Sequence, residues 1–334
     1  ENYFPIIPMI LVNGAEGIAC GFSTTIPNFN PEDLVSSIKK WLGDKEYFKT
    51  APHLVPWYRG FNGTNTLIEK NGVVTGWVSR GKLEQSKGKK WWDITETPVG
   101  LKTYDLKEWI EYLRDGTPPE GKKWKKTDGR FIKEYRDISA NTNSVHYQIL
   151  PSSEFTPDID TKGNFNILLS NHTLTNIVAL DENFIPRKFN SINELFEVWC
   201  EKRLKCYDQR REYVLKSYVD ELKVLQSKFT FLSKVISKEI DPGQPKAQLV
   251  SAIEKSSQSI IKIDGTYDYL CNLPIGSLTK EKMDDINALI NSTTNEYTRY
   301  KKLTSEVLWK QELDEFLVAY KKFLTTRNDS DNDK

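Results

Sequence analysis

Apolar side chains recur every three or four residues along one long stretch of this chain, between Ser191 and Glu239. Ser191 and Glu194 have the spacing of a capping box, which marks a helix start. Neither proline nor glycine follows until Pro242. The pattern predicts one helical rod of about 46 residues, roughly 70 Å long, with nearly the repeat of a coiled coil. Its stripe, interrupted only by Arg211, comprises Leu204, Tyr207, Val214, Tyr218, Leu222, Leu225, Phe229, Leu232 and Ile236.

A second stripe with the same periodicity runs from Met283 to Val307, and Thr279 precedes it as a typical N-cap residue. The two helices can pair antiparallel, with the segment between them as a knob at the far end. Two amphipathic helices inside an all-α core would show the same periodicity, but the length of the first favours a projecting rod. We expect another amphipathic helix over 308–324 and a polar, disordered tail over 325–334.

Residues 51–190 have a different character, because short β-like runs alternate with turns. One helix stands out, at Leu106–Arg114. This pattern predicts a domain with a sheet, so the fold class is α+β. The predicted strands are Thr64–Glu69, Val73–Val78, Trp91–Glu96, Val145–Leu150, Phe165–Leu169 and Ile177–Leu180.

Near the start, an apolar run meets a loop punctuated by Gly14, Gly17 and Gly21. The glycine spacing fits neither a dinucleotide-binding loop nor a P-loop, so a tight packed turn is favoured over a phosphate-binding site. A helix is expected to begin at Asn30 and to end at Leu42.

Composition adds several exclusions. The 334 residues suffice for two or three domains, and a net charge of +1 excludes a polycation. No apolar run reaches 18 residues, so we expect no membrane partner. The four cysteines form no CxxC pair and do not cluster with the three histidines, which argues against a zinc site. Catalytic spacings and paired-carboxylate motifs are also missing.

Positive charge is concentrated between Ala51 and Arg136, where 17 Lys plus Arg stand against 11 Asp plus Glu, a balance of +6. Basic residues interleaved with tryptophan suit a polyanion surface, although such runs are also common in solvated loops. The residues alone therefore indicate a DNA-binding or scaffold protein with a projecting coiled coil. The candidate DNA-binding lysines in these runs are Lys89, Lys90, Lys122, Lys123, Lys125 and Lys126.

Several motifs resemble the type IIA DNA topoisomerases, in particular their eukaryotic form. The longest is PIIPMILVNGAEGIACGFSTTIPNF, from Pro5 to Phe29. Others are Pro56–Phe61, Ile94–Pro98, Gly265–Leu270 and Ser277–Glu281. The resemblance extends over nearly the whole chain, from about Phe4 to Leu324.

The resemblance implies an architecture. Residues 1–50 would close a winged-helix region and 51–190 would form a tower. Residues 191–240 and 279–310 would be coiled-coil arms, and 241–278 with 308–324 the dimerisation gate through which DNA leaves. The gate residues implied are Tyr267, Tyr269, Leu270 and Ile275.

The resemblance also implies an activity, in which a homodimer passes one DNA duplex through a transient double-strand break in another. ATP and Mg²⁺ would serve the full-length enzyme, whose nucleophilic tyrosine lies upstream of Phe4. We therefore expect no catalytic residue, metal or cofactor in this chain, which begins with Glu rather than Met, and no activity from it alone. The alternative is a non-enzymatic, dimeric DNA-binding scaffold.

One functional residue follows from the resemblance: Ile26, before Pro27, falls where the family is expected to place an isoleucine that intercalates into DNA. An apolar wedge of this kind bends the duplex. Lys102 stands in a segment where eukaryotic members carry Arg and Trp, and we expect it to replace part of that charge. The implied location is the nucleus for a cellular enzyme, or the host cytoplasm, nucleus or virion for a viral one.

Overall fold

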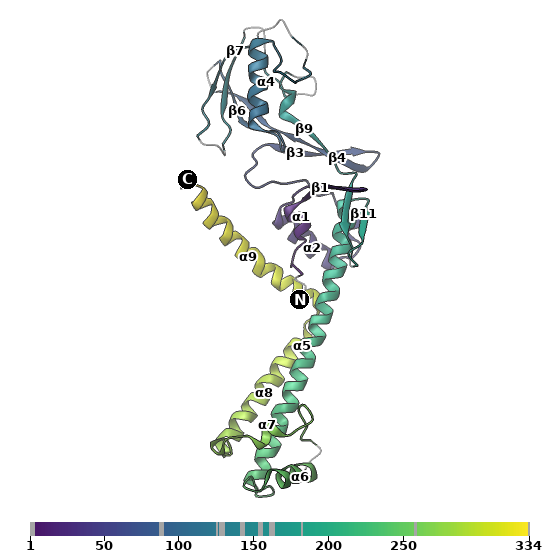
Figure 1. Ribbon diagram of the computed structural model, residues 1–334, viewed down its shortest axis with the longest axis vertical. Coiled ribbons are helices and arrows are strands. Elements are labelled where there is room, and N and C mark those ends of the chain that lie inside the picture. The colour runs from purple at the N-terminus through teal and green to yellow at the C-terminus, as the bar shows by residue number, and fades with distance from the viewer. Residues whose placement is uncertain are drawn as a thin grey trace. The chain divides into compact units, whose positions relative to one another are not determined.

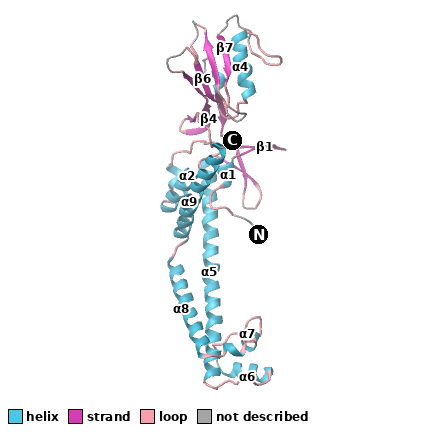
Figure 2. Ribbon diagram, turned by 90° about the vertical axis from the view of Figure 1, so that its left-hand side faces the viewer, coloured by secondary structure: helices cyan, strands magenta, loops and turns pink. Residues whose placement is uncertain are grey.

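The computed structural model describes residues 4–86, 90–124, 126, 131–140, 144–152, 156–159, 164–181, 183–256 and 259–332, without the side chains of Ala19, Ile275 and residues 328–332. The chain divides into two compact units, Glu1–Cys200 and Glu201–Lys334. Strands lie in the first unit and long helices dominate the second, which confirms the α+β class (Figures 1 and 2).

The first unit begins with short helices around a hairpin. The helices are α1 (Met9–Asn13), α2 (Pro31–Gly43) and α3 (Tyr47–Thr50), and the antiparallel hairpin is β1 (Ala15–Ala19) with β2 (Phe22–Ile26). The start of α2 was predicted correctly, since Asn30 Oδ1 accepts a hydrogen bond from the Glu32 backbone N–H at 3.0 Å. Its buried face includes Leu34, Val35, Ile38, Trp41 and Leu42.

Two larger antiparallel sheets follow. One has the order β3-β4-β9, with β3 (Thr64–Lys70), β4 (Val73–Arg80) and β9 (Leu169–Thr173). The other has the order β5-β6-β8-β7, with β5 (Lys82–Gln85), β6 (Trp92–Glu96), β7 (Ile132–Asp137) and β8 (Tyr147–Pro151).

Helix α4 (Thr103–Asp115) covers one face of the four-stranded sheet (Figure 1). Its residues Leu106, Ile110 and Leu113 share a buried core with Ile94 and Ile149 of the sheet. This packing explains why the apolar residues of the helix recur at helical spacing while those of the strands alternate. The predicted strand Phe165–Leu169 is wrong for most of its length, because a 3₁₀ turn η1 (Asn166–Leu168) precedes β9.

A last hairpin leads into the long helix. Strands β10 (Ile177–Leu180) and β11 (Pro186–Phe189) pair antiparallel, and α5 (Ile192–Ile236) begins three residues later. The predicted cap is present, since the Glu194 N–H donates to Ser191 Oγ at 3.1 Å. The Glu194 carboxylate in turn accepts from the Asn190 N–H at 2.8 Å, one residue earlier than expected.

In the second unit, α5 and α8 (Lys280–Lys302) run side by side in opposite directions (Figures 1 and 2). Tyr218 of α5 lies against Tyr300 of α8, with ring centroids 6.2 Å apart. The predicted N-cap of α8 is confirmed, because Thr279 Oγ1 accepts from the Lys282 N–H at 3.3 Å. Since α8 returns along α5, the predicted pairing of the two stripes is present.

The return stripe is interrupted, because α8 ends at Lys302 and α9 (Ser305–Asn332) begins three residues later. Two side chains of α5 fix this break. The Arg211 guanidinium donates to the backbone oxygens of Leu303 (2.7 Å) and Lys301 (2.9 Å), and Ser305 Oγ bonds with Asp208 at 2.5 Å. Arg211 therefore interrupts the apolar stripe because it binds carbonyl groups that the end of α8 leaves unpaired.

Helix α9 corrects two expectations about the C-terminal segment. Trp309 stacks on Tyr207 of α5 at 5.5 Å, and Glu312 accepts hydrogen bonds from Tyr207 and Arg210. This part of 308–324 therefore lies against the N-terminal half of α5 rather than with the knob. The helix also continues to Asn332, where a disordered tail was expected. No glycine or proline occurs after Gly276 to end it.

The knob between the arms contains α6 (Lys246–Ser256), α7 (Asp268–Cys271) and the 3₁₀ turn η2 (Ile275–Ser277). Ser227 attaches it to α5, since its buried hydroxyl accepts from the Ile261 N–H at 3.1 Å. Tyr269 donates to the Ile261 carbonyl at 2.7 Å. The knob core, which includes residues of α5, consists of Phe231, Ile240, Leu249, Ile253, Ile260, Tyr267 and Leu270.

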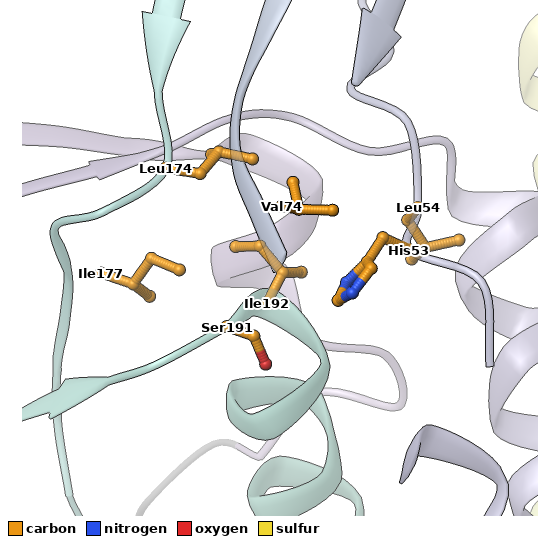
Figure 3. Close-up of a pocket in the computed structure, with 7 residues that line it drawn as sticks. All are labelled: His53, Leu54, Val74, Leu174, Ile177, Ser191 and Ile192. Carbon is orange, nitrogen blue, oxygen red and sulfur yellow. The ribbon is translucent and has the colours of Figure 1, made fainter. Parts of the chain in front are cut away.

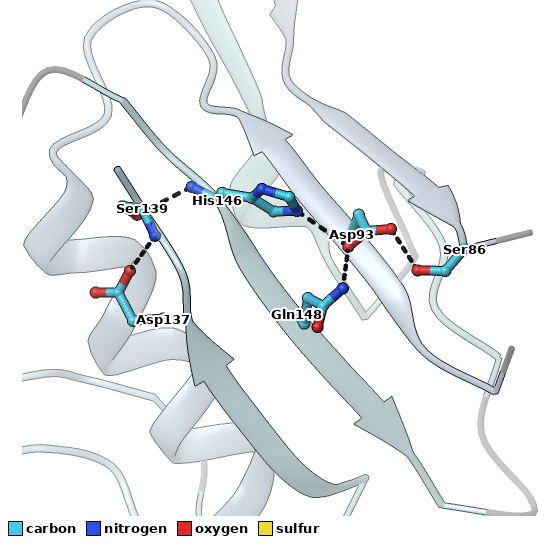
Figure 4. A network of polar contacts seen from close by, with 6 residues as sticks. All are labelled: Ser86, Asp93, Asp137, Ser139, His146 and Gln148. Carbon is cyan, nitrogen blue, oxygen red and sulfur yellow. Dashed lines mark hydrogen bonds and ion pairs between the residues drawn. The ribbon is translucent and has the colours of Figure 1, made fainter. Parts of the chain in front are cut away.

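A polar network lies on the four-stranded sheet and centres on Asp93 of β6 (Figure 4). Its carboxylate accepts hydrogen bonds from Ser86 Oγ and from Gln148 Nε2 (2.9 Å), and it lies 3.1 Å from His146 Nε2. Partial burial alone would raise the pKa of Asp93, but these three partners together hold that pKa below its ordinary value.

We predict that the network stabilises the sheet at neutral pH and fails in acid. A carboxyl with a lowered folded pKa stabilises the fold above its ordinary pKa of about 4, and this stabilisation is lost as pH falls through the folded value. Asp93→Asn should lower the free energy of unfolding by about 1 kcal/mol at pH 7. The difference from the parent should shrink between about pH 5 and pH 3.

The measurement is thermal unfolding followed by tryptophan fluorescence, because Trp91 and Trp92 adjoin Asp93 in sequence. Glu84→Gln is the matched control, since Glu84 is exposed on β5 and makes a surface ion pair with Lys82 at 3.4 Å. A difference between Asp93→Asn and the parent that stays constant across this pH range contradicts the proposed role of the network.

Candidate functional site

The β1–β2 hairpin presents the most exposed large apolar side chain among the described residues. Its strands pair from Ala15↔Ile26 to Ala19↔Phe22, so the turn consists of Cys20 and Gly21 alone. Gly21 has φ +80°, a conformation that glycine adopts without strain. Ile18, beside this turn, is 94% exposed, and Phe22 is 53% exposed. The hairpin tip thus places an isoleucine in solvent, where burial would normally be favoured.

Ile26 lies at the other end of the hairpin and is only 3% exposed. It cannot enter a DNA duplex from this position without unfolding the base of the hairpin, so the structure does not support Ile26 as the wedge. The surrounding backbone is closely packed: a Cβ added to Gly14 would lie 2.7 Å from both the Ile26 carbonyl oxygen and Asn28 Oδ1. The isoleucine that anchors the hairpin and the one that it exposes are eight positions apart in the sequence.

The outer edge of β2 is tied to the segment that leads into β10. Asn176 Nδ2 donates to the Ser23 carbonyl oxygen at 2.8 Å and also to Ser23 Oγ. The Thr25 N–H donates to the Asn176 carbonyl oxygen at 2.9 Å, and the Val178 N–H donates to Thr24 Oγ1 at 3.1 Å. These bonds join residues about 150 positions apart and hold the hairpin at the middle of β2.

The candidate lysines have different environments. Lys122 is paired with Asp105 (2.8 Å) and Glu108 (3.2 Å), and these bonds raise its pKa, so it is not an open phosphate ligand. Lys90, Lys102, Lys123 and Lys126 are exposed, and the described contacts give them no acidic partner. Lys89 and Lys125 lie outside the described residues.

The tryptophan between these lysines faces the protein rather than solvent. Trp124 packs edge-on against Trp109, with ring centroids 4.9 Å apart, and lies 5.2 Å from Tyr112. Trp91 similarly stacks under the Arg136 guanidinium at 4.4 Å. The alternation of basic and aromatic residues therefore reflects local packing, and these rings are not arranged as platforms for bases.

The described residues contain no site for a small ligand at the junction of the strands with α5. The cavity there has a volume of about 10 Å³, room for at most one water molecule (Figure 3). It is lined by His53, Leu54, Val74, Leu174, Ile177, Ser191 and Ile192. Nor do three or more His, Cys, Asp or Glu side chains converge in a metal-binding arrangement within those residues.

The predicted gate residues lie mostly inside the knob. Tyr267 is 8% exposed and Leu270 is 1% exposed, so both belong to the core of their own protomer. Tyr269 is partly buried and its hydroxyl is bonded to the Ile261 carbonyl. The side chain of Ile275 lies outside the described residues. The end of α5 contributes Phe231 to the core that buries Tyr267 and Leu270.

The model of the family that comprises the A subunits of DNA gyrase and topoisomerase IV matches residues 1–314 of this chain. The chain belongs to this family. DNA topoisomerase 2 of Penicillium chrysogenum is 30% identical over 96% of the chain, and that of Invertebrate iridescent virus 6 is 27% identical over 93%. The chain spans 21% and 26% of the lengths of these two relatives.

A solved structure agrees with the sequence relatives. The Plasmodium falciparum topoisomerase II DNA-binding, cleavage and re-ligation domain matches with a TM-score of 0.70 at 28% identity. The match covers 98% of this chain and 46% of that one. Membership of the topoisomerase family is thus supported by both sequence and fold. No helix in the described part of this family member is long and apolar enough to cross a bilayer.

The buried position of Leu270 generates a prediction about the stability of the knob. Leu270→Asp should unfold the knob rather than separate two intact protomers, because it places a charge in an apolar core. The milder change Leu270→Ala should cost about 2–5 kcal/mol.

Leu289→Ala on α8 is the matched control, because Leu289 is 52% exposed and the same substitution there should cost little. Hydrogen exchange of the Ile261 and Leu270 amides measures the local opening of the knob. Equal exchange rates in the two variants contradict the assignment of Leu270 to the core.

Proposed function

We propose that this chain is the part of a type II DNA topoisomerase that bends the duplex to be cut and forms the arms of the exit gate. The observation that carries the proposal is the exposed Ile18 on a hairpin tied at its edge, in a chain of this family. An apolar side chain inserted between base steps unstacks them and kinks the duplex, at a cost of a few kcal/mol. Ile18, rather than Ile26, is the proposed wedge.

Double-stranded DNA is the proposed partner. Two copies of the hairpin in a homodimer would bend one duplex symmetrically, and bending selects segments that deform readily without reading bases. The exposed lysines Lys90, Lys102, Lys123 and Lys126 are proposed to contact phosphates, together with Lys89 and Lys125, which lie outside the described residues. Such contacts weaken as salt increases.

The antiparallel pair of α5 and α8 supports a role as a gate arm, with the knob at its end as the meeting point of two protomers. The contacts between protomers must involve side chains other than Leu270 and Tyr267, since these two are buried in the protomer's own core. An interface that opens during the reaction is expected to be modest in area.

The whole enzyme is proposed to use ATP and Mg²⁺. Both would serve parts of the enzyme outside this chain, as the resemblance implies. A nuclear location is proposed for a cellular form and a location in the host cell or virion for a viral one, in keeping with the fungal and viral relatives.

A non-enzymatic DNA-binding scaffold is the competing function. It would need the same hairpin and arms but no strand passage. The full-length protein distinguishes the two, because only the topoisomerase relaxes supercoiled DNA when ATP is supplied.

The central prediction concerns Ile18. In the full-length dimer, Ile18→Ala should reduce the ratio of bent to straight duplex by about tenfold or more, since the wedge that offsets unstacking is gone. Affinity for DNA should change less, because phosphate contacts supply much of it. Fluorescence energy transfer between the ends of a labelled duplex measures the bending.

Ile26→Ala is the matched control. It should lower the stability of the fold by about 2–5 kcal/mol through loss of buried volume, and any bending defect should follow the fraction unfolded. Normal bending by Ile18→Ala would contradict the role of Ile18 as the wedge. A selective bending defect in well-folded Ile26→Ala would assign that role to Ile26.

A second prediction concerns the chain by itself. At any concentration of Mg²⁺ and ATP, the purified 334-residue chain should neither cleave nor relax supercoiled plasmid, because the resemblance places the nucleophilic tyrosine outside it. Agarose gel electrophoresis of the plasmid gives the result. Sustained relaxation that copurifies with the chain through successive columns would contradict the placement of the catalytic tyrosine outside this chain.

A further inference from the structure

We propose that Asn176 is a positioning residue for DNA bending, which holds the hairpin so that Ile18 can press into the duplex. This inference rests on the proposed function of Ile18 and extends it to a residue about 150 positions away in the sequence. Asn176 itself lies just before β10 and has no place in any motif that the sequence singles out.

The register of the hairpin connects the two residues. Ile18 on β1 stands directly opposite Ser23 on β2, and Ser23 is the residue whose carbonyl and hydroxyl oxygens both accept from Asn176 Nδ2. Opposed residues of an antiparallel pair are the closest neighbours across the strands. Asn176 therefore binds the hairpin at the residue that lies directly opposite the exposed isoleucine.

The hairpin needs the support of these hydrogen bonds because its tip is mechanically weak. A two-stranded ribbon alone is at best marginally stable in water, so its tip bends easily. The buried Ile26 fixes its base, but Ile18 lies opposite Ser23, three residues further along β2 towards the exposed end. A side chain that unstacks bases is pushed back by the duplex, and an unsupported ribbon would yield instead of the DNA.

The bonds around Asn176 are suited to resist that force. Its side chain donates to Ser23, and its own carbonyl accepts from the Thr25 N–H at 2.9 Å. Two residues later, the Val178 N–H donates to Thr24 Oγ1 at 3.1 Å. Three consecutive residues of β2 are thus bonded to one short segment, which supplies an edge partner that β2 otherwise lacks.

The test is a comparison of bending by variants of the full-length dimer. Asn176→Ala removes the side-chain donor but leaves the backbone bonds, and should lower the bent-to-straight ratio by about fivefold, with DNA affinity little changed. Asn176→Asp keeps the size but faces two oxygens of Ser23 with a carboxylate, and should be at least as defective. Asn171→Ala, an exposed asparagine on β9, should bend DNA normally.

A double-mutant cycle separates positioning from stability. If Asn176 acts through the wedge, Asn176→Ala should add no bending defect in an Ile18→Ala background. Any loss of thermal stability would persist in that background, so the two effects are distinguishable. Ser23→Ala, which removes the hydroxyl acceptor alone, should give a smaller bending defect and serves if Asn176→Ala folds poorly.

The outcomes are separable. If Ile18→Ala bends DNA normally, the proposed wedge fails and this inference fails with it. If Ile18→Ala is defective but a folded Asn176→Ala or Ser23→Ala bends DNA as the parent does, the wedge stands and the positioning role is overturned. A full additional loss from Asn176→Ala in the Ile18→Ala background also overturns it.

Discussion

Burial of one apolar stripe along α5 is the interaction on which the helical unit depends. A helix of 45 residues has far more apolar surface than it can bury alone, and α8 returns along it to cover that surface. The same helix contributes Phe231 and Leu232 to buried positions near its C-terminal end and Tyr207 about a third of the way along it. The knob and α9 are thus attached to one helix at two levels, about 36 Å apart along its axis.

Much of this fold was predictable because the signals are local and repeated. The caps at Asn30, Ser191 and Thr279, the absence of glycine and proline in α5, and the helical spacing in α4 each mark an element within a short window. The break between α8 and α9 was not predictable, because its cause lies on another helix. In the sequence, Arg211 only interrupts an apolar stripe, and its carbonyl acceptors lie about 90 positions away.

The candidate site was harder to predict, because it depends on which isoleucine is exposed and which is buried. The resemblance indicated an intercalating isoleucine, and the motif contains five isoleucines, two of which lie in the hairpin. Only the register of the hairpin separates them, with Ile18 in solvent and Ile26 in the core. Cys20-Gly21 stands between two β-compatible runs, which is typical of a hairpin turn. The three closely spaced glycines around it are also typical of a packed loop, so the hairpin was not predicted. Nothing in the sequence near Asn176 or Lys122 indicates their distant partners.

The junction of α8 and α9 has a consequence for how motion can pass along the arm. A break at proline is permanent, whereas this one contains no proline or glycine and is maintained by Asp208 and Arg211, one turn apart on α5. Sliding α8 along α5 by a single turn would withdraw both partners together and leave a sequence free to join into one helix. The bend between α8 and α9 therefore depends on side chains of a neighbouring helix and not on the residues of the bend itself.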